Sequence, residues 1–239
     1  MDSPSGTAPR PEIEQELAAV YRLYAAIARH TVVSGRGGKL LYAGELDAQG
    51  CRLVRGANIA QVASLAAAKD PALARKAIRD GVIDFLVTSL DEALRILKNE
   101  IRKHQCVAVG AMVAEEQLLR EMQERGVLPD LLPPSSWPIS AKPEIAGFAV
   151  RGARPLESAP LRAGRTFVAV AVPQVWVRRQ AEFESLLLDS LPAEDEVNRQ
   201  WLRLSPRFMG PEARRLRSLE CTAETFSDLI ERVGQATPD

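Results

Sequence analysis

The chain has 239 residues, of which 46% are hydrophobic, and its 31 Lys and Arg residues balance its 31 Asp and Glu residues. This composition excludes a disordered chain and is enough for one large core or two small ones. Because the formal net charge is zero, no overall field draws the protein to nucleic acid or to anionic lipid.

The cysteines and the N-terminal stretch bear on localisation. Cys51, Cys106 and Cys221 lie far apart, and with only two histidines in the chain they form no metal-ligand spacing. We therefore expect free thiols in a cytoplasmic protein and no metal site. Residues 1–10 lack the apolar core of a signal peptide, and we expect them to form a flexible tail. No stretch is long and apolar enough for a membrane span, so we expect no membrane association.

The first third of the chain predicts alternating helices and strands from its apolar periodicity and its glycines. In chain order the expected elements are a helix at 12–30, a glycine-rich loop at 34–38, a strand at 39–44, a helix at 57–68 whose last residues leave a short strand open, and a helix at 70–80.

The segment that follows has the pattern of a strand running into a helix. Residues 82–87 form a short apolar run typical of a parallel strand that is covered on both faces. Ser89 and Glu92 have the spacing of a capping box, so we expect the helix to begin near Leu90. Asp91 and Arg95 are expected to pair on its exposed face. Its apolar stripe is formed by Leu90, Ala93, Leu94, Leu97 and Ile101.

Further strands and helices alternate up to a proline-rich segment. We expect a strand at 106–111, a helix at 115–126 and a short strand at 127–132. Strands that alternate with helices, joined by right-handed crossovers, predict an α/β fold with a parallel sheet and helices on both faces. The four prolines of residues 133–144 mark a domain boundary or a rigid loop.

The region after the prolines has a different pattern and predicts a smaller α+β region at 145–239. Its expected elements are a strand at 165–172, a helix at 178–191, a strand at 215–221 and a helix at 223–234 that Thr222 caps.

A dinucleotide site needs glycines after the first strand, where backbone N–H groups and a helix N-terminus contact a pyrophosphate. Gly44, Gly50 and Gly56 follow that strand at intervals of six residues, which is not the GxGxxG spacing. Glu45 and Asp47 lie among them, and their carboxylates would repel a phosphate. The spacing therefore favours turn glycines over a dinucleotide cradle.

Residues 22–132 nevertheless resemble the NAD-dependent urocanases (urocanate hydratases). The segments that carry the resemblance are LLYAGEL, GANIAQ (56–61), AKD (68–70), SLDEAL (89–94), AVGAMVA (108–114) and ERGVLPDLLPPSS (124–136). The resemblance implies a Rossmann-like domain, to which we assign residues 11–144. In that family NAD acts as an electrophile that activates the imidazole of the substrate for addition of water.

The departures from the family pattern fall at expected contact positions. Residues 51–55 read CRLVR where the family has GLGGM, and the acidic residue expected near a ribose hydroxyl falls at Ala68. Val113 and Ala114 replace a Gly-Asn pair, and residues 133–137 read PPSSW in place of TDQTS. The long segments that complete the family's substrate site are missing, and residues 145–239 resemble nothing in the family.

Two hypotheses place function in the crevice at the carboxyl ends of the strands. The first is a non-catalytic or repurposed relative that binds another small molecule there or none; the second is a genuine NAD-dependent lyase of the urocanase type. The sequence identifies no catalytic residue, because His30 and His104 are expected at helix ends and no Ser-His-Asp set or carboxylate pair is evident. The candidate cofactor-binding residues are Gly44, Gly50, Gly56, Asn58, Gly110, Ser135 and Trp137.

A third hypothesis is an anion- or nucleic-acid-binding assembly protein that uses residues 199–217. This segment carries six arginines together with Trp201 and Phe208, which could grip phosphates and stack on bases. A solvated helix face with its aromatics in the core is the more ordinary explanation, so we do not expect nucleic acid as a partner. The sequence leaves a homo-oligomer open.

Overall fold

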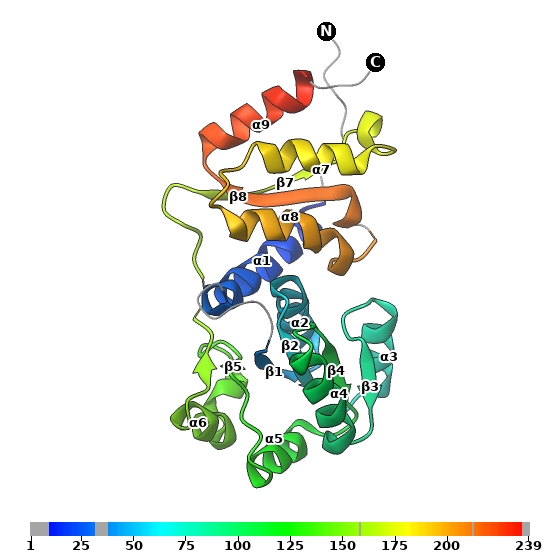
Figure 1. Ribbon diagram of the computed structural model, residues 1–239, viewed down its shortest axis with the longest axis vertical. Helices are drawn as coiled ribbons and strands as arrows, with labels where there is room; N and C mark the ends of the chain where they lie inside the picture. Colours follow the sequence, from blue (N-terminus) through cyan, green and yellow to red (C-terminus); the bar gives the residue numbers. More distant parts are fainter. Residues whose placement is uncertain (1–9, 32–37, 158, 212, 236–239) are drawn as a thin grey trace. The chain divides into compact units, whose positions relative to one another are not determined.

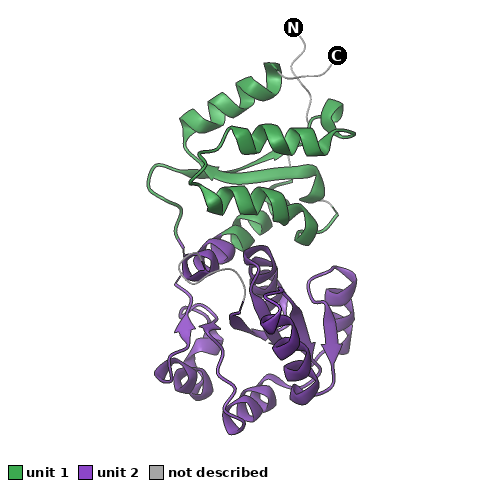
Figure 2. Ribbon diagram, viewed as in Figure 1, with its two compact units in different colours: residues 1–21, 160–239 green, residues 22–159 purple. Residues whose placement is uncertain are grey.

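The computed structural model describes residues 10–31, 38–157, 159–211 and 213–235. The chain forms two compact units (Figure 2), unit 1 with residues 1–21 and 160–239 and unit 2 with residues 22–159. Unit 2 is thus inserted into unit 1 in sequence. The expected tail at 1–10, apart from Arg10, and most of the glycine-rich loop at 34–38 lie outside the described residues.

Unit 2 is built on one six-stranded sheet with the order β3-β4-β2-β1-β5-β6, and each neighbouring pair of strands is parallel (Figure 1). This confirms the predicted α/β class with a parallel sheet. The strands are β1 (Leu40–Glu45), β2 (Ala63–Ala67), β3 (Phe85–Val87), β4 (Ala108–Ala111), β5 (Leu131–Leu132) and β6 (Arg154–Pro155).

Helices cover both faces of this sheet, as predicted. One face carries an apolar cluster in which Tyr42 of β1 and Leu65 of β2 pack with side chains of α4, α5 and α6. Residues alternate along a strand, so the buried Leu41 points to the other face, where α2 contacts β1 and β2. The helices are α1 (Pro11–Thr31), of which residues 22–31 belong to unit 2 and the earlier ones to unit 1, α2 (Ala48–Ala60), α3 (Pro71–Arg79), α4 (Leu90–Arg102), α5 (Glu115–Glu124) and α6 (Pro143–Val150).

The prediction for residues 57–68 was wrong in its helix boundaries. Helix α2 begins at Ala48, because Asp47 caps it, and ends at Ala60, where Gln61 takes a left-handed conformation with φ of 61°. The alanine-rich residues after Gln61 form β2, in which every residue is buried. Alanine favours helices, and burial between two layers of helices overrides that preference here.

Two details of the segment at 82–103 also differ from expectation. β3 lies at the edge of the sheet, and Phe85 is 46% exposed, so this strand is not covered on both faces. Asp91 pairs with Arg125 of the segment after α5, and Arg95 is not its partner.

The expected start of α4 is confirmed. Helix α4 begins at Leu90, and the Ser89 hydroxyl accepts a hydrogen bond from the Glu92 N–H at 3.3 Å. The Glu92 carboxylate accepts from the N–H of Thr88, one residue before the cap, so the capping box is not reciprocal. The predicted apolar stripe packs into the sheet cluster.

The proline-rich residues 133–144 form no boundary between the units. They include the short helix η1 (Pro138–Ala141) and lead into α6, and the chain then adds β6 beside β5. The expected boundary at 144 therefore lies inside unit 2, because the parallel sheet gains its last strand only after α6. The strand expected at 127–132 is reduced to β5.

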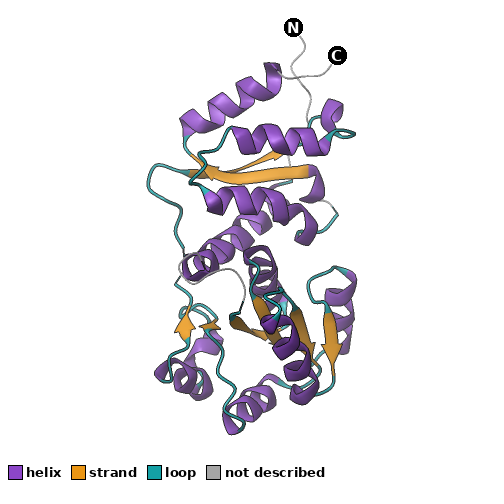
Figure 3. Ribbon diagram, viewed as in Figure 1, coloured by secondary structure: helices purple, strands orange, loops and turns teal. Residues whose placement is uncertain are grey.

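Unit 1 is a two-stranded antiparallel ribbon between helices (Figure 3). Leu219 and Cys221 of β8 pack with α7 and α9, whereas Ser218 and Glu220 bond to α8 and to Tyr21 of α1. This confirms the smaller α+β region. Its elements are β7 (Thr166–Ala171), η2 (Gln174–Trp176), α7 (Gln180–Asp189), α8 (Glu196–Phe208), η3 (Ala213–Arg215), β8 (Leu216–Cys221) and α9 (Ala223–Gln235).

Further expectations concern the cysteines, α9 and the membrane. Cys51, Cys106 and Cys221 are free thiols. The N–H of Thr225 donates to the Thr222 hydroxyl at 3.2 Å, which confirms the predicted cap of α9. Within the described ranges, none of the helices combines the length and the apolar character that a membrane span requires.

Candidate functional site

The sheet of unit 2 has a topological switch point between β1 and β5. The chain leaves β1 for β2 on one side of it, and it later places β5 on the other side. In open α/β sheets such a switch point opens a crevice outside the carboxyl ends of the strands, where ligands bind. The position at which the fold places this crevice is bordered here by Gly44 and Glu45 at the end of β1, by the first turns of α2 and α5, and by η1.

The N-terminus of α2 already carries a negative charge. The Asp47 carboxylate accepts a hydrogen bond from the N–H of Gly50 at 2.9 Å and caps the helix. Gly50 allows this turn to lie against β1, since a Cβ at this position would stand 2.0 Å from the carbonyl oxygen of Glu45. The close helix-strand approach of a dinucleotide fold is thus present, but a carboxylate meets the positive end of the helix dipole.

Glu45 spans the space between the ends of β1 and β2. Its carboxylate accepts from the N–H of Lys69 at 2.9 Å, directly after β2. Burial raises the pKa of Glu45, and the charges of Glu115 and Asp47 raise it further, against the hydrogen bond from Lys69. Ala68, where a ribose-binding acid was expected, is 1% exposed.

Side chains from α5 and η1 close over Gly44. Gly44 has φ of +81°, and a Cβ there would stand 2.8 Å from Ile139 Cδ1 and 3.3 Å from Glu115 Oε1. Lys142 forms ion pairs with Glu115 and with Glu116, the latter at 2.9 Å. Burial would lower the pKa of Lys142, but these hydrogen bonds raise it overall. We call residues 139–142 the crevice strap, because they hold this corner of the site closed.

Four of the seven predicted cofactor-binding residues lie at this carboxyl edge. Gly44 and Gly50 flank the end of β1, and Ser135 and Trp137 lie in the segment between β5 and η1. Ser135 is exposed and Trp137 is half-buried. The structure brings these four to one edge of the sheet.

The other three lie elsewhere and have packing partners. A Cβ at Gly56 would stand 3.1 Å from the backbone nitrogen of Tyr24, so this glycine lets α2 cross α1 closely. Asn58 Nδ2 donates to the carbonyl of Val82 at 2.8 Å, before β3 and so at the amino edge of the sheet. Gly110 lies within β4, where a Cβ would stand 2.9 Å from the side chain of Ile83.

Both histidines lie away from the crevice. His30 is in the last turn of α1 and its carbonyl accepts from Lys39 Nζ at 2.6 Å, just before β1. Burial lowers the pKa of His30, and the charges of Lys39 and Arg154 lower it further. His104 follows α4 and precedes β4. Residues that precede parallel strands lie at the amino edge, opposite the crevice.

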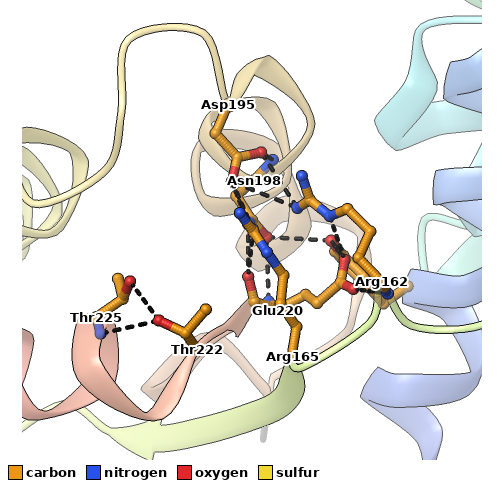
Figure 4. Close-up of polar contacts among 8 residues, drawn as sticks. Arg162, Arg165, Asp195, Asn198, Glu220, Thr222 and Thr225 are labelled. Carbon is orange, nitrogen blue, oxygen red and sulfur yellow. Dashed lines mark hydrogen bonds and ion pairs between the residues drawn. The ribbon is translucent and has the colours of Figure 1, made fainter.

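Unit 1 contains a buried polar network that the sequence did not indicate (Figure 4). The carboxylate of Glu220 in β8 accepts from Tyr21 at 3.0 Å and from Arg162 Nε at 3.2 Å. Asp195, which caps α8, accepts from Asn198 Nδ2 at 2.9 Å and from Arg165 at 3.1 Å. These residues come from four separate segments of the chain, so no local sequence motif predicts the network.

Several residues of the arginine-rich segment at 199–217 make contacts within unit 1. Trp201 is fully buried against Tyr21 with ring centroids 5.1 Å apart, so it presents no face to a base. Arg199 donates to the carbonyls of Leu188 and Leu191, and the buried Arg217 pairs with Glu184.

Comparison with known protein families matches residues 17–160 to the family model described as the urocanase Rossmann-like domain. The match covers more than half of the chain and includes every strand of the parallel sheet. The ribbon of β7 and β8 and the helices α7 to α9 lie outside the matched range.

Proposed function

The chain belongs to the urocanase family, whose Rossmann-like domain it shares, and from this premise we propose that it is a non-catalytic relative whose crevice no longer binds NAD. One observation carries the proposal: the Asp47 carboxylate is bonded to the Gly50 N–H at the helix N-terminus where the family would place a pyrophosphate.

Electrostatics support the proposal. Two like unit charges 4 Å apart repel each other by about 1 kcal/mol in water and about 4 kcal/mol near a protein surface. Asp47, Glu45, Glu115 and Glu116 lie around the same edge, and Lys142 is already paired with two of them. A pyrophosphate would therefore meet more repulsion than attraction at this edge.

The side chains next to Gly44 also oppose the binding of NAD. Gly44 is the position at the end of β1 where a ligand could approach the backbone most closely, yet Ile139 and Glu115 occupy the space next to it. The residues that border the crevice thus do not fit a dinucleotide, and we derive no reaction step through one.

Proton transfer also lacks its usual groups. His30 and His104 lie at the opposite edge of the sheet, and the crevice offers carboxylates in their place. Glu45 is a crevice carboxyl whose pKa is raised by burial, but its carboxylate is held by the Lys69 N–H. A genuine NAD-dependent lyase, the alternative, would need the crevice strap to move away.

The test measures NAD on the full-length chain purified without added cofactor. Denaturing release followed by mass spectrometry should find no stoichiometric NAD, and calorimetric titration with NAD should show no saturable binding. Asp47→Asn is the informative variant, because asparagine also caps a helix but carries no charge. Any NAD affinity that appears in Asp47→Asn alone supports electrostatic exclusion. Stoichiometric NAD in the wild-type protein, or conversion of urocanate by it, would overturn the proposal.

A further inference from the structure

The edge strand β3 presents an apolar surface beside a helix. It has β4 as its single neighbour in the sheet (Figure 1). The first residue of β3, Phe85, is 46% exposed. Strands of a parallel sheet are normally covered on both faces, and an exposed edge with a large apolar side chain is a typical site for another chain to dock.

Phe85 lies in a groove of about 700 Å³ formed with the second half of α4. Ile96, half-buried, adds apolar surface to it, and Asn99 adds an amide. The rim carries the exposed cations Arg95, Lys98 and Arg102. The groove therefore combines an apolar floor with a basic rim, and we call it the β3-α4 groove.

The carboxylate of Glu92 lies within electrostatic reach of Arg95, but it accepts its hydrogen bonds from Thr88. Glu100 also lines the groove, but it pairs with Lys103 at 2.9 Å. Neither Arg95 nor Lys98 forms an ion pair with any residue in the described part of the chain. Unpaired like charges around an apolar floor favour a partner of opposite charge.

We propose that the β3-α4 groove is a docking site for an acidic segment of a partner protein that carries an apolar anchor residue. The anchor packs on Phe85 and Ile96, and Asp or Glu side chains on either side of it meet Arg95, Lys98 and Arg102. A second copy of this chain fits less well, because a two-fold contact through this surface would bring two basic rims together. The proposal is independent of the state of the crevice.

The test uses the full-length chain and a short fluorescein-labelled peptide rich in Asp and Glu with one central Phe, followed by fluorescence anisotropy. We expect saturable binding that weakens steeply as salt is raised, because exposed ion pairs are screened. The double variant Arg95→Glu/Lys98→Glu should weaken binding at least about tenfold. Arg151→Glu, which reverses another exposed charge on the same unit, should leave the affinity unchanged.

Matched probes distinguish the occupants. A peptide with Lys in place of the acidic residues, and an acidic peptide without Phe, should bind weakly or not at all, and Phe85→Ser should abolish the preference for the anchor. The exposed charge variants keep the test valid if Phe85→Ser fails to fold. The proposal is overturned if the acidic peptide does not bind, or if Arg151→Glu weakens peptide binding as much as the double variant does. It is also overturned if a single-stranded oligonucleotide binds the same rim instead, or if sedimentation shows a dimer that Phe85→Ser dissociates.

Discussion

Asn198 of α8 forms hydrogen bonds with both backbone groups of Glu220 in β8. Its Nδ2 donates to the Glu220 carbonyl at 2.7 Å, and its Oδ1 accepts from the Glu220 N–H at 3.1 Å. The amide thus takes the place of a neighbouring strand at this residue of the ribbon. Asn198 is 0% exposed, so no water replaces it.

Removal of this amide should destabilise unit 1. Asn198→Ala leaves the buried N–H of Glu220 without a partner and its carbonyl with only the 3.5 Å hydrogen bond from Arg165, and we expect a loss of about 2 to 4 kcal/mol in the free energy of unfolding. Urea denaturation followed by tryptophan fluorescence measures this loss. Asn99→Ala, at an exposed position of α4, is the control and should change little. Equal effects of the two substitutions would contradict the structural role of Asn198.

Asp195 should make unit 1 sensitive to acid. Burial by itself would raise the pKa of its carboxyl, but the hydrogen bond from Asn198 and the charge of Arg162 lower it below the usual 3.8 overall. A carboxyl whose pKa is lower in the folded than in the unfolded state stabilises the fold at pH values above its unfolded-state pKa. This contribution to stability is lost as the pH falls toward and below the folded-state pKa.

We therefore expect the free energy of unfolding to fall as the pH decreases from about 5 to 3, and to fall less steeply in Asp195→Asn, which cannot lose this contribution. Denaturation curves at several pH values check the slope. If the free energy of unfolding changes with pH at the same slope in Asp195→Asn and in the wild-type protein, the prediction that its partners lower the pKa of Asp195 is wrong.

Gly50 should tolerate no side chain. In Gly50→Ala the new Cβ would meet the Glu45 carbonyl oxygen, and backbone cannot move aside cheaply, so we expect a loss of about 3 kcal/mol or more. Gly234→Ala in α9 is the matched control, because a Cβ at that position would meet no atom within 4 Å. There the loss of backbone freedom in the unfolded chain should stabilise the protein by up to about 1 kcal/mol. Thermal unfolding of both variants should show shifts of opposite sign.

Lys142 should stabilise the closed crevice. Lys142→Met removes the cation that pairs with Glu115, whose side chain is only 12% exposed and lies near other carboxylates. We therefore expect a loss of about 1 to 3 kcal/mol in the free energy of unfolding. The added substitution Glu115→Gln should recover part of this loss, which a double-mutant cycle measures. Lys98→Met, at an exposed lysine without an ion pair to any described residue, serves as the control. Additive effects of Lys142→Met and Glu115→Gln would show that the two side chains are not coupled.

Local patterns in the sequence determined the class of unit 2 and several of its details. The alternation of apolar strands with amphipathic helices predicts a parallel sheet, and the start of α4 at Leu90 and the cap of α9 at Thr222 depend on neighbouring residues alone. The family resemblance follows from the same segments, and the matched range confirms it. Such features depend on contacts a few residues apart, which the order of amino acids contains directly.

Only the tertiary structure decided which residues share a site. Gly56 and Asn58 looked like neighbours of Gly44 in sequence, but the extent of α2 carries Gly56 to a close contact with α1 and Asn58 to the amino side of the sheet. Glu220 meets Tyr21 and Arg162 although the whole of unit 2 separates these two partners in the chain. The exposure of Phe85 depends on the position of β3 at the sheet edge. These relationships arise from strand order and helix packing, which bring distant residues together and leave no local signature.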